Sequence, residues 1–451
     1  MSEPIISVSG LRGTIGDQLT PVVASNYVAA WASTLPKGKV VIGRDGRESG
    51  KLLAQAVAAT LAAHGLTAVH LDVAATPTVG VAVRTLGAVA GVQISASHNP
   101  KQYNGLKLFG SEGRVLPKTE GEGVLAAYRA GKTQWSSVDD LGSISSEDDP
   151  HADHLDLVLK TVDVDAIRAK SFKVLLDSNR GAGSILGRRL LEALGCTVEI
   201  LGETPDGQFE HTPEPTAENL VGVRKQVTSA SAAVGFCQDP DADRLAVIDE
   251  MGRYIGEELT LALCLQQALP KLTGGGQGTV VTNCATSSVS KAVTEQLGCT
   301  PLQSAVGEAN VCDLMIAEKA VFGGEGNGGP IDPAVGYVRD SFVGMARILD
   351  LLASDGGPLS KIVDGLPKYA MHKDKIDLDT EKLPALIDAI KSAMPEAKAS
   401  MPDGLKLQWP DSWLLVRGSN TEPIVRLIAE APTLAAAQDI CAHGIEISKQ
   451  L

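Results

Sequence analysis

The segment KVVIGRDGRESGKLLAQAVAATLAAHGLTAVHLD, residues 39–72, carries the clearest structural signal in the sequence. An apolar run opens it, a loop of Gly, Asp and Arg follows, and a helix-forming stretch ends at Gly65 before a second apolar run. Glycine suits the left-handed turn that often ends a helix. The order strand, loop, helix, glycine and strand is typical of α/β units around a mostly parallel sheet.

Two further segments, residues 172–201 and 278–305, repeat this order. Lys39 and Lys173 occupy matching positions 134 residues apart, and Thr279 follows 106 residues later. These spacings have the size of domains and are too long for solenoid repeats. We therefore predict three related α/β domains, with chance similarity between generic units as the alternative. The matching exit glycines are Gly65, Gly195 and Gly298.

The last part of the chain has a different pattern. Residues 372–394 predict a strand and a helix, residues 405–420 two short strands, residues 424–431 another strand and residues 434–450 a closing helix. This order indicates a smaller α+β domain. The predicted domains are residues 1–150, 151–253, 254–367 and 368–451.

Composition and charge restrict the class of protein. The chain is 44% hydrophobic and 21% charged, which is typical of a globular protein. Its formal net charge of −14 argues against nucleic acid or an anionic membrane as partner, although a few arginines can still bind a phosphorylated substrate. No apolar run reaches about 18 residues, so we expect no membrane span.

The cysteines and the first residues indicate the compartment. The seven cysteines are odd in number and form no Cys-x-x-Cys pair, which favours reduced thiols over a disulfide or zinc framework. The start MSEPIISVSG has no basic region and no long apolar run, so we expect no secretory leader. We therefore expect a cytoplasmic protein.

The first candidate site is the loop Ser-Ala-Ser-His-Asn-Pro, residues 95–100, which follows the strand-like AVAGVQI. Pro100 cannot continue a strand ladder, so the loop begins where a strand ends. In α/β folds, sites lie at the carboxyl ends of strands. A serine here can act as a nucleophile, but the Gly-x-Ser-x-Gly elbow of hydrolases is absent. An ordinary hydrogen-bonded turn is the alternative.

The second candidate site is VGFCQDPDADRLAVIDE, residues 234–250. Three closely spaced carboxylates repel one another unless a cation lies among them, and oxygen ligands suit Mg²⁺ or Ca²⁺. Glu250 falls at the twelfth position of a possible EF-hand, but Arg244 stands where that loop requires glycine, and both flanks resemble strands. We predict a strand–loop–strand Mg²⁺ site, with a solvated acidic turn as the alternative. The carboxylates are those of Asp239, Asp241 and Asp243.

Two later loops suit a sugar phosphate. In FGGEGNGGPID, residues 322–332, five glycines surround Glu325 and Asn327, whose side chains can bind vicinal hydroxyls. A mobile glycine-rich loop is the alternative. In VRGSNTEPIVRL, residues 416–427, two guanidinium groups bracket small polar side chains, an arrangement that can cradle a phosphate. A surface turn with unrelated ion pairs is the alternative. The residues of this cradle are Arg417, Ser419, Asn420, Thr421 and Arg426.

Taken in order, the four loops resemble those of the α-D-phosphohexomutase superfamily, and the resemblance runs from SGLRGTIG near the start to the final helix. It implies three α/β domains with mixed sheets and a C-terminal α+β domain around a central cleft. It also implies that Ser97 is a phosphoserine and, with the three aspartates, holds one Mg²⁺. The catalytic residues implied are Ser97, Arg12, His98 and Lys107. Arg244 is implied to bind substrate.

The implied reaction interconverts a hexose 6-phosphate and a hexose 1-phosphate through a 1,6-bisphosphate of glucose or glucosamine, which also serves as activator. The sequence is most similar to the archaeal glucosamine-phosphate type, with a phosphomannomutase or phosphoglucomutase as the alternative. Gly329 stands where many members carry a histidine, so no acid–base role passes to it. A metal-dependent phosphatase and a non-catalytic sugar phosphate or Ca²⁺ binding protein are the other readings. We expect a monomer or homodimer.

Overall fold

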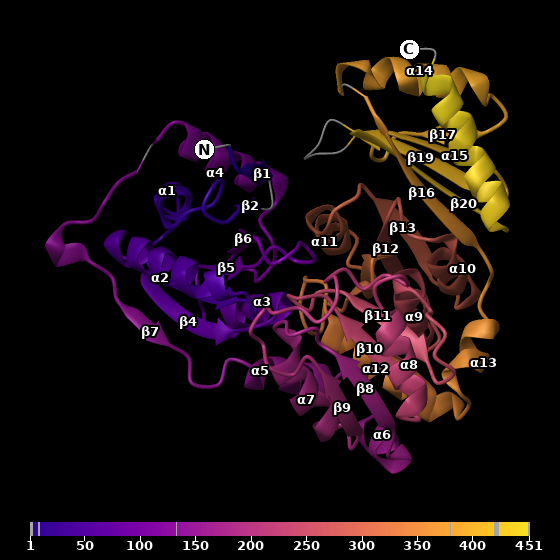
Figure 1. Cartoon of the computed structure of the whole chain (residues 1–451), viewed down its shortest axis with the longest axis horizontal. Coiled ribbons are helices and arrows are strands. Elements are labelled where there is room, and N and C mark those ends of the chain that lie inside the picture. Colours follow the sequence, from indigo (N-terminus) through magenta and orange to yellow (C-terminus); the bar gives the residue numbers. More distant parts are fainter. Residues whose placement is uncertain (1–2, 8–9, 132, 379, 419–423, 450–451) are drawn as a thin grey trace. The chain divides into compact units, whose positions relative to one another are not determined.

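The computed structural model describes residues 3–7, 10–131, 133–378, 380–418 and 424–449. These residues form two compact units, each made of sheets covered by helices (Figure 1). The first unit comprises Met1–Ala268 and Asn327–Asp364, and the second comprises Leu269–Gly326 and Gly365–Leu451.

The first unit opens with a mixed seven-stranded sheet in the order β1-β2-β6-β5-β3-β4-β7. The strands β3, β4, β5 and β7 run parallel, whereas β1, β2 and β6 pair antiparallel. Helices α1 and α2 bury one face, where Trp31 packs with Ile42, and α3 buries the other, where Val79 packs with Phe109. The elements are β1 Ile5–Ser7, β2 Gly10–Thr14, α1 Pro21–Ala32, β3 Lys39–Arg44, α2 Glu48–Ala63, β4 Thr67–Val73, α3 Thr76–Thr85, β5 Ala90–Ile94, β6 Tyr103–Gly110, α4 Lys118–Arg129, the 3₁₀ helix η1 Val138–Asp140 and β7 Ile144–Ser146.

A second sheet of the same unit has the order β11-β10-β8-β9. Its strands β8, β9 and β10 are parallel, and β11 is antiparallel to β10. Val227 of α8 packs against Leu175 and Ile248 of this sheet. The elements are α5 Ala152–Leu159, α6 Val164–Lys170, β8 Lys173–Asp177, α7 Gly183–Ala193, β9 Thr197–Leu201, α8 Val221–Ser229, β10 Val234–Gln238, β11 Leu245–Asp249, α9 Glu257–Thr273, which continues into the second unit, β15 Gly329–Ile331, α12 Ser341–Asp355 and α13 Leu359–Asp364.

The second unit contains a third α/β sheet, in which β12 lies between β13 and β14 and is parallel to both. It also contains a five-stranded antiparallel sheet, β16-β20-β19-β18-β17, with α14 and α15 packed on one face (Figure 1). The elements are β12 Thr279–Asn283, α10 Ser288–Gln296, β13 Thr300–Ser304, α11 Glu308–Ala317, β14 Phe322–Glu325, β16 Ala370–Asp377, η2 Thr380–Lys382, α14 Leu383–Ala393, β17 Lys398–Ser400, β18 Leu405–Gln408, β19 Trp413–Gly418, β20 Ile424–Ala431 and α15 Leu434–Ser448.

The predicted repeat is present in the structure. The strands β3, β8 and β12 begin at Lys39, Lys173 and Thr279, and each is parallel to the strand that follows its helix. The exit glycines have φ angles of +75°, +74° and +74°, in the left-handed region that favours glycine. The fold class of three α/β domains and a C-terminal α+β domain is thus confirmed, although the short strand β17 was not predicted. The exact domain boundaries stay a prediction.

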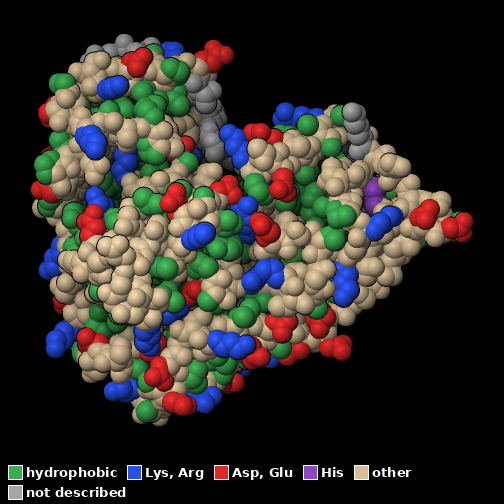
Figure 2. Space-filling view, turned by 180° about the vertical axis from the view of Figure 1, so that it is seen from behind, with side chains coloured by type: hydrophobic (Ala, Val, Ile, Leu, Met, Phe, Trp, Pro, Cys, Tyr) green, Lys and Arg blue, Asp and Glu red, His purple; other side chains and the backbone are tan. Residues whose placement is uncertain are grey.

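The surface charges, the cysteines and the lengths of the helices relate to the predictions made from composition. Acidic and basic side chains are interspersed on the face shown in Figure 2. All seven cysteines lie in the described part of the chain, and none of them forms a disulfide. Among the described residues, no helix combines the length and apolar character needed to cross a membrane.

Candidate active site

Ser97 lies in the loop after β5 and has an unusual backbone conformation. Its φ angle is +49°, in the left-handed region that a residue with a side chain rarely adopts. The Ser97 N–H donates a hydrogen bond to Ser95 Oγ at 2.9 Å, which helps to hold this conformation. Strained residues of this kind cluster at functional sites, where the surrounding structure maintains them.

A buried ion pair, which the sequence interpretation did not single out, supports this loop. Arg47 pairs with Asp45, and Asp45 Oδ2 accepts a hydrogen bond from Ser95 Oγ at 2.6 Å. Arg47 Nη2 donates to the carbonyl oxygen of Ser97 at 2.8 Å and to that of Asn99. Asp45 and Arg47 follow β3, which is parallel to its neighbour β5. Parallel strands end at the same edge of a sheet. The position of Asp45 and Arg47 directly after a strand is therefore the sequence feature that could have predicted their place beside the Ser97 loop.

The three aspartates of the second loop lie close together between β10 and β11. One carboxylate oxygen from each lies within 4.8 Å of the others, and all three residues are fully buried. The flanking elements are an antiparallel pair of strands, which excludes the EF-hand alternative. Oδ1 of Asp241 and Oδ1 of Asp243 accept no hydrogen bond from any residue that the structure describes. Buried carboxylate oxygens without donors are costly, so this oxygen donor set fits a hard divalent cation such as Mg²⁺.

The serine loop and the aspartate loop meet inside the first unit. Ser97 Oγ donates a hydrogen bond to Asp239 Oδ2 at 2.8 Å, although the two residues are 142 positions apart in the sequence. His98 Nδ1 lies 3.4 Å from the same hydroxyl group. The Ser97 hydroxyl group therefore lies directly beside the carboxylates that can hold a cation.

Three basic side chains approach the aspartates. Lys107 Nζ lies 3.0 Å from Asp243 Oδ2 and 3.4 Å from Asp241 Oδ2. Arg339 Nη2 donates to Asp243 Oδ2 at 2.6 Å. Arg12 lies on β2, one strand away from Lys107 on β6. Positive charge thus lies close to the aspartate cluster.

Arg244 follows the aspartates directly. Its backbone N–H donates to Asp239 Oδ1 at 3.1 Å, and its Nε lies 3.9 Å from Asp243 Oδ1. Burial and the charge of Arg339 act to lower the pKa of Arg244, but the carboxylates of Asp239, Asp243 and Glu257 together outweigh them, and the pKa is raised. The described contacts of Arg244 are thus with the aspartate loop, and its predicted role toward substrate stays a prediction.

Burial and charge separate the ionisation of these groups. Burial, reinforced by the charges of the other two aspartates, raises the pKa of Asp239. Burial opposes ionisation of Asp241 as well, but the charge of Lys107, the hydrogen bond from Thr76 and other neighbouring groups together outweigh it, and the pKa is lowered. Burial, together with the positive charges of neighbouring arginines, lowers the pKa of His98 to about 3. Burial also lowers the pKa of Arg12.

Gly329, where many superfamily members carry a histidine, is covered by Arg339. A Cβ atom at Gly329 would lie 2.4 Å from Arg339 Cδ and 2.9 Å from Arg339 Cβ. The side chain of Arg339 therefore fills the space beside residue 329 and extends to Asp243. Sequence reasoning missed Arg339, because its spacing from the glycine-rich loop carries no recognisable pattern.

In the second unit, Glu325 lies at the end of β14 and is 3% exposed. Glu325 Oε1 accepts hydrogen bonds from Asn283 Nδ2 at 2.7 Å and from the Gly307 N–H at 3.1 Å. The N–H of Gly326 donates to Thr286 Oγ1 at 3.1 Å. The loop is thus held by residues at or near the ends of β12 and β13, which the sequence interpretation did not include. This unit ends at Gly326, so the next residue, Asn327, already belongs to the first unit.

The C-terminal sheet carries the two predicted arginines. Arg417 on β19 lies directly opposite Arg426 on β20 in the antiparallel register. Like charges in directly opposite positions repel, and a bound anion would relieve this repulsion. Arg417 Nε donates to Asp403 Oδ2 at 2.7 Å. Ser419, Asn420 and Thr421 lie outside the described residues.

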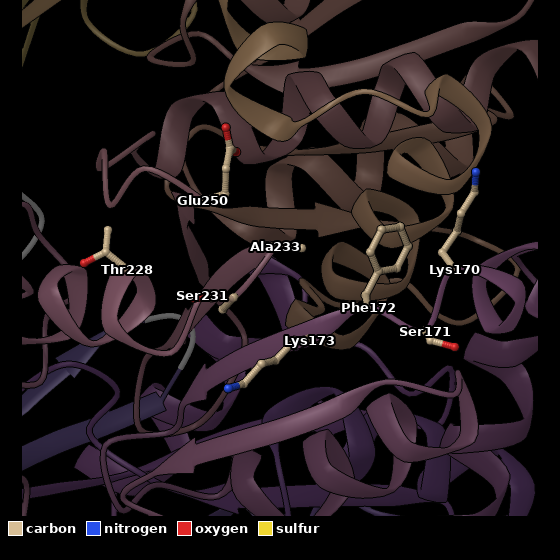
Figure 3. A pocket seen from close by; sticks show the side chains of 9 residues that line it. Lys170, Ser171, Phe172, Lys173, Thr228, Ser231, Ala233 and Glu250 are labelled. Carbon is tan, nitrogen blue, oxygen red and sulfur yellow. The ribbon is translucent and has the colours of Figure 1, made fainter.

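A pocket of about 490 Å³ lies away from the aspartate loop, beside the amino ends of β8 and β10 (Figure 3). The aspartate loop follows the opposite, carboxyl end of β10. The side chains labelled in Figure 3, among them Lys170, Lys173 and Glu250, point in different directions rather than toward one centre. We therefore take the aspartate cluster, and not this pocket, as the candidate active site.

Comparison with known proteins agrees with this geometry. Four family domains match the chain in order: phosphoglucomutase/phosphomannomutase α/β/α domain I over residues 5–135, domain II over 152–252, domain III over 257–369 and the C-terminal domain over 375–446. The chain belongs to the phosphoglucomutase/phosphomannomutase family. It is therefore an isomerase of the phosphohexomutase class, as the resemblance implied.

Full-length relatives share this family membership. The chain is 33% identical over 98% of its length to a phosphoglucomutase/phosphomannomutase of Thermococcus kodakarensis, covering 97% of that protein. It is 32% identical over 98% of its length to a probable phosphoglucosamine mutase of Methanopyrus kandleri, also covering 97% of it. A crystal structure of a family member from Burkholderia thailandensis, 27% identical, superposes with a TM-score of 0.84 over 99% of this chain and 98% of the other. The predicted similarity to archaeal members is confirmed.

Proposed function

We propose that this phosphohexomutase interconverts hexose 6-phosphate and hexose 1-phosphate through a phosphoserine at Ser97, with glucosamine phosphate as its preferred sugar. The observation that carries the proposal is the 2.8 Å hydrogen bond between Ser97 Oγ and Asp239 in a cluster of three buried carboxylates. Phosphoryl transfer requires mainly positioning and charge neutralisation, and this arrangement supplies a nucleophile beside a cation site.

One Mg²⁺ would be held by Asp239, Asp241 and Asp243 together with an oxygen on Ser97. The cluster fits because two of its carboxylate oxygens lack donors and all three residues are buried. When bound, the ion supplies positive charge beside the phosphoryl group.

The basic residues of the first unit would neutralise the transferring group. In the first half-reaction a bond forms between phosphorus and a sugar hydroxyl oxygen, the bond from phosphorus to Ser97 Oγ breaks, and the hydroxyl proton passes through the protein to Ser97 Oγ. The 1,6-bisphosphate intermediate then turns over. In the second half-reaction a bond forms between Ser97 Oγ and the other phosphorus, the bond from that phosphorus to its sugar oxygen breaks, and the proton returns to that sugar oxygen. Lys107 and Arg12 would stabilise the charge on this group and assist proton transfer, while His98 Nδ1 would orient the serine oxygen.

The second unit would bind the parts of the substrate that do not react. The opposed pair Arg417 and Arg426, with Ser419, Asn420 and Thr421, would hold the other phosphate. Glu325 of the second unit and Asn327 of the first unit would bind sugar hydroxyls, and Arg244, also of the first unit, would contact the substrate. In this assignment, the glycines around Glu325 allow the sugar to approach the backbone closely.

Two observations support glucosamine as the sugar. The GEGNGG form of the sugar loop resembles that of archaeal glucosamine-phosphate enzymes, and the Methanopyrus kandleri relative carries the name probable phosphoglucosamine mutase. The Thermococcus kodakarensis relative carries the name phosphoglucomutase/phosphomannomutase, which makes glucose or mannose phosphate the second candidate.

A coupled assay with Mg²⁺ and a trace of hexose 1,6-bisphosphate tests the proposal. We expect kcat/KM to be highest for glucosamine phosphate and lower for glucose phosphate and mannose phosphate. Ser97→Ala is expected to abolish turnover and phosphate incorporation from labelled substrate, while sugar phosphate binding by calorimetry persists. Inorganic phosphate as the main product would instead indicate a phosphatase, and full activity of Ser97→Ala would refute the assignment.

A further inference from the structure

A second cavity, of about 250 Å³, lies in the second unit between the α10–β13 segment and the strands β18 and β19. It is smaller than the roughly 300 Å³ at which cavities for drug-sized ligands begin. None of its residues belongs to the site described above. Its polar and aromatic lining residues are Ser288, Lys291, Gln303, Lys406, Gln408 and Trp413.

Lys406 is the central group of this cavity. It is 4% exposed, which is rare for a lysine without a carboxylate partner. Its Nζ donates to the carbonyl oxygen of Cys284 at 2.7 Å and to Gln303 Oε1 at 3.1 Å, and it lies 4.5 Å from the centre of the Trp413 ring. An ammonium group has three N–H donors, so one of them has no oxygen acceptor within the described part of the chain.

A second cation lines the same cavity. Lys291 on α10 is exposed, and its ion pair with Glu295, at 3.8 Å between two exposed groups, holds it weakly. Burial lowers the pKa of Lys406 to about 8, and the charge of Lys291 contributes in the same direction. The nearby carboxylate of Glu430 acts the other way, but it already accepts hydrogen bonds from the Ser288 N–H and from Trp413 Nε1. An anion between the two lysines would stabilise both charges.

We propose that this cavity binds a small phosphate group, either the free ion or a short-chain ester, at a second anion site outside the catalytic machinery. Two ammonium groups match the double charge of phosphate, and the Ser288 hydroxyl and the Gln408 amide offer neutral hydrogen bonds to further oxygens. Trp413 supplies an apolar wall that tolerates a few carbon atoms of an ester. This anion site is independent of the proposed function, because none of its residues belongs to the proposed catalytic or substrate-binding residues.

Binding here would connect two parts of the second unit. Lys291 and Ser288 belong to α10 of the third α/β sheet, whereas Lys406 and Trp413 belong to the C-terminal sheet. A ligand that bridges them stabilises their packing in proportion to the logarithm of its concentration over its dissociation constant. Because Lys406 lies over the Trp413 ring, the ligand is also expected to change the fluorescence of this tryptophan.

The test compares the binding of inorganic phosphate and of glycerol phosphate to the full chain, by equilibrium dialysis and by tryptophan fluorescence. Lys291→Ala and Lys406→Met are each expected to raise the dissociation constant for phosphate at this cavity at least about tenfold, since each removes a hydrogen bond from a charged group. Lys449→Ala is the matched control, because Lys449, which follows the last residue of α15, is also an exposed lysine paired with a glutamate, Glu446, at 2.7 Å. Its phosphate binding is expected to equal that of the wild type.

The outcome separates the two sources of phosphate. Tighter binding of glycerol phosphate identifies an ester as the ligand, and tighter binding of inorganic phosphate identifies the free ion. Unchanged stoichiometry and affinity in Lys291→Ala overturn the proposal, even if Lys406→Met fails to fold. Mutase turnover of Lys291→Ala without added phosphate is expected to match the wild type, so a failure of the catalytic assignment at Ser97 would leave this test valid.

Discussion

Thr76 orients Asp241 through two hydrogen bonds. Its Oγ1 donates to Asp241 Oδ2 at 2.6 Å, and its backbone N–H donates to the Asp241 carbonyl oxygen at 2.9 Å. Thr76 begins α3, so the start of this helix is joined directly to the aspartate loop. The Oδ1 atom of Asp241 accepts no hydrogen bond within the described part of the chain, so this oxygen is free to bind a cation. Groups that orient metal ligands in this way affect metal affinity strongly.

Thr76→Val is therefore expected to weaken Mg²⁺ binding about tenfold or more, because it removes the hydroxyl and retains the shape of the side chain. Calorimetric titration with Mg²⁺ measures the dissociation constant, and the Mg²⁺ dependence of turnover gives an independent value. Thr76→Ser keeps the hydroxyl and is expected to stay near the wild type. Equal affinity in the valine and serine variants would show that Thr76 has no part in orienting Asp241.

Arg47→Ala is expected to lower the free energy of unfolding by about 3 kcal/mol, since it leaves the buried carboxylate of Asp45 without its partner. It also removes the donor to the Ser97 carbonyl oxygen, so turnover is expected to fall. Urea unfolding and the coupled assay measure the two effects. Arg188→Ala, which breaks ion pairs with exposed Glu192 and Glu203, is the control and is expected to cost less than about 1 kcal/mol. Similar losses in both variants would contradict the prediction.

Gly329→Ala is expected to displace Arg339 from Asp243, because the new Cβ would overlap the Arg339 side chain. We expect a fall in kcat/KM of about tenfold and a loss of roughly 1–3 kcal/mol in stability from overpacking. Gly222→Ala is the matched control, since a Cβ there meets no atom within 4 Å and the residue lies in α8. This control is expected to be neutral or slightly stabilising. Wild-type kinetics in Gly329→Ala would show that residue 329 tolerates a side chain.

The His211–Asp177 pair is expected to stabilise the protein more at acidic than at alkaline pH. His211 Nε2 lies 2.8 Å from Asp177 Oδ2, and its Nδ1 lies 2.9 Å from the Thr212 carbonyl oxygen. Burial acts to lower the pKa of His211, but the hydrogen bond and charge of Asp177 outweigh it, and the pKa is raised above 6.5. A raised pKa contributes stability that is complete below the unfolded pKa and is lost as pH rises through the folded pKa.

Thermal unfolding of the wild type and of His211→Ala across pH 5 to 9 tests this sign. The difference between their midpoints is expected to be largest below pH 6.5 and to shrink as the pH rises. A difference that is constant or grows with pH would mean that His211 is neutral in the folded protein.

Local sequence carried much of the fold and part of the site. Strand starts at Lys39, Lys173 and Thr279 were predicted because each opens an apolar run with a loop and a helix behind it. The aspartates were recognisable because three carboxylates in five residues are electrostatically unusual. By contrast, Arg339 and Thr76 occupy ordinary positions in ordinary segments. Their importance lies in contacts with residues about 100 and 165 positions away, which no local pattern encodes.

By itself, the sequence determined the α/β repeat, the α+β character of the C-terminal part and the types of group available for chemistry, because hydrophobic periodicity and glycine act over a few neighbouring residues. Only the tertiary structure decided that Ser97 contacts Asp239, that Arg339 fills the space beside Gly329 and that Lys406 is buried against the Trp413 ring. These relationships depend on the packing of strands and helices from distant parts of the chain. Burial and distance, which set the strength of charge interactions, exist only after that packing has formed.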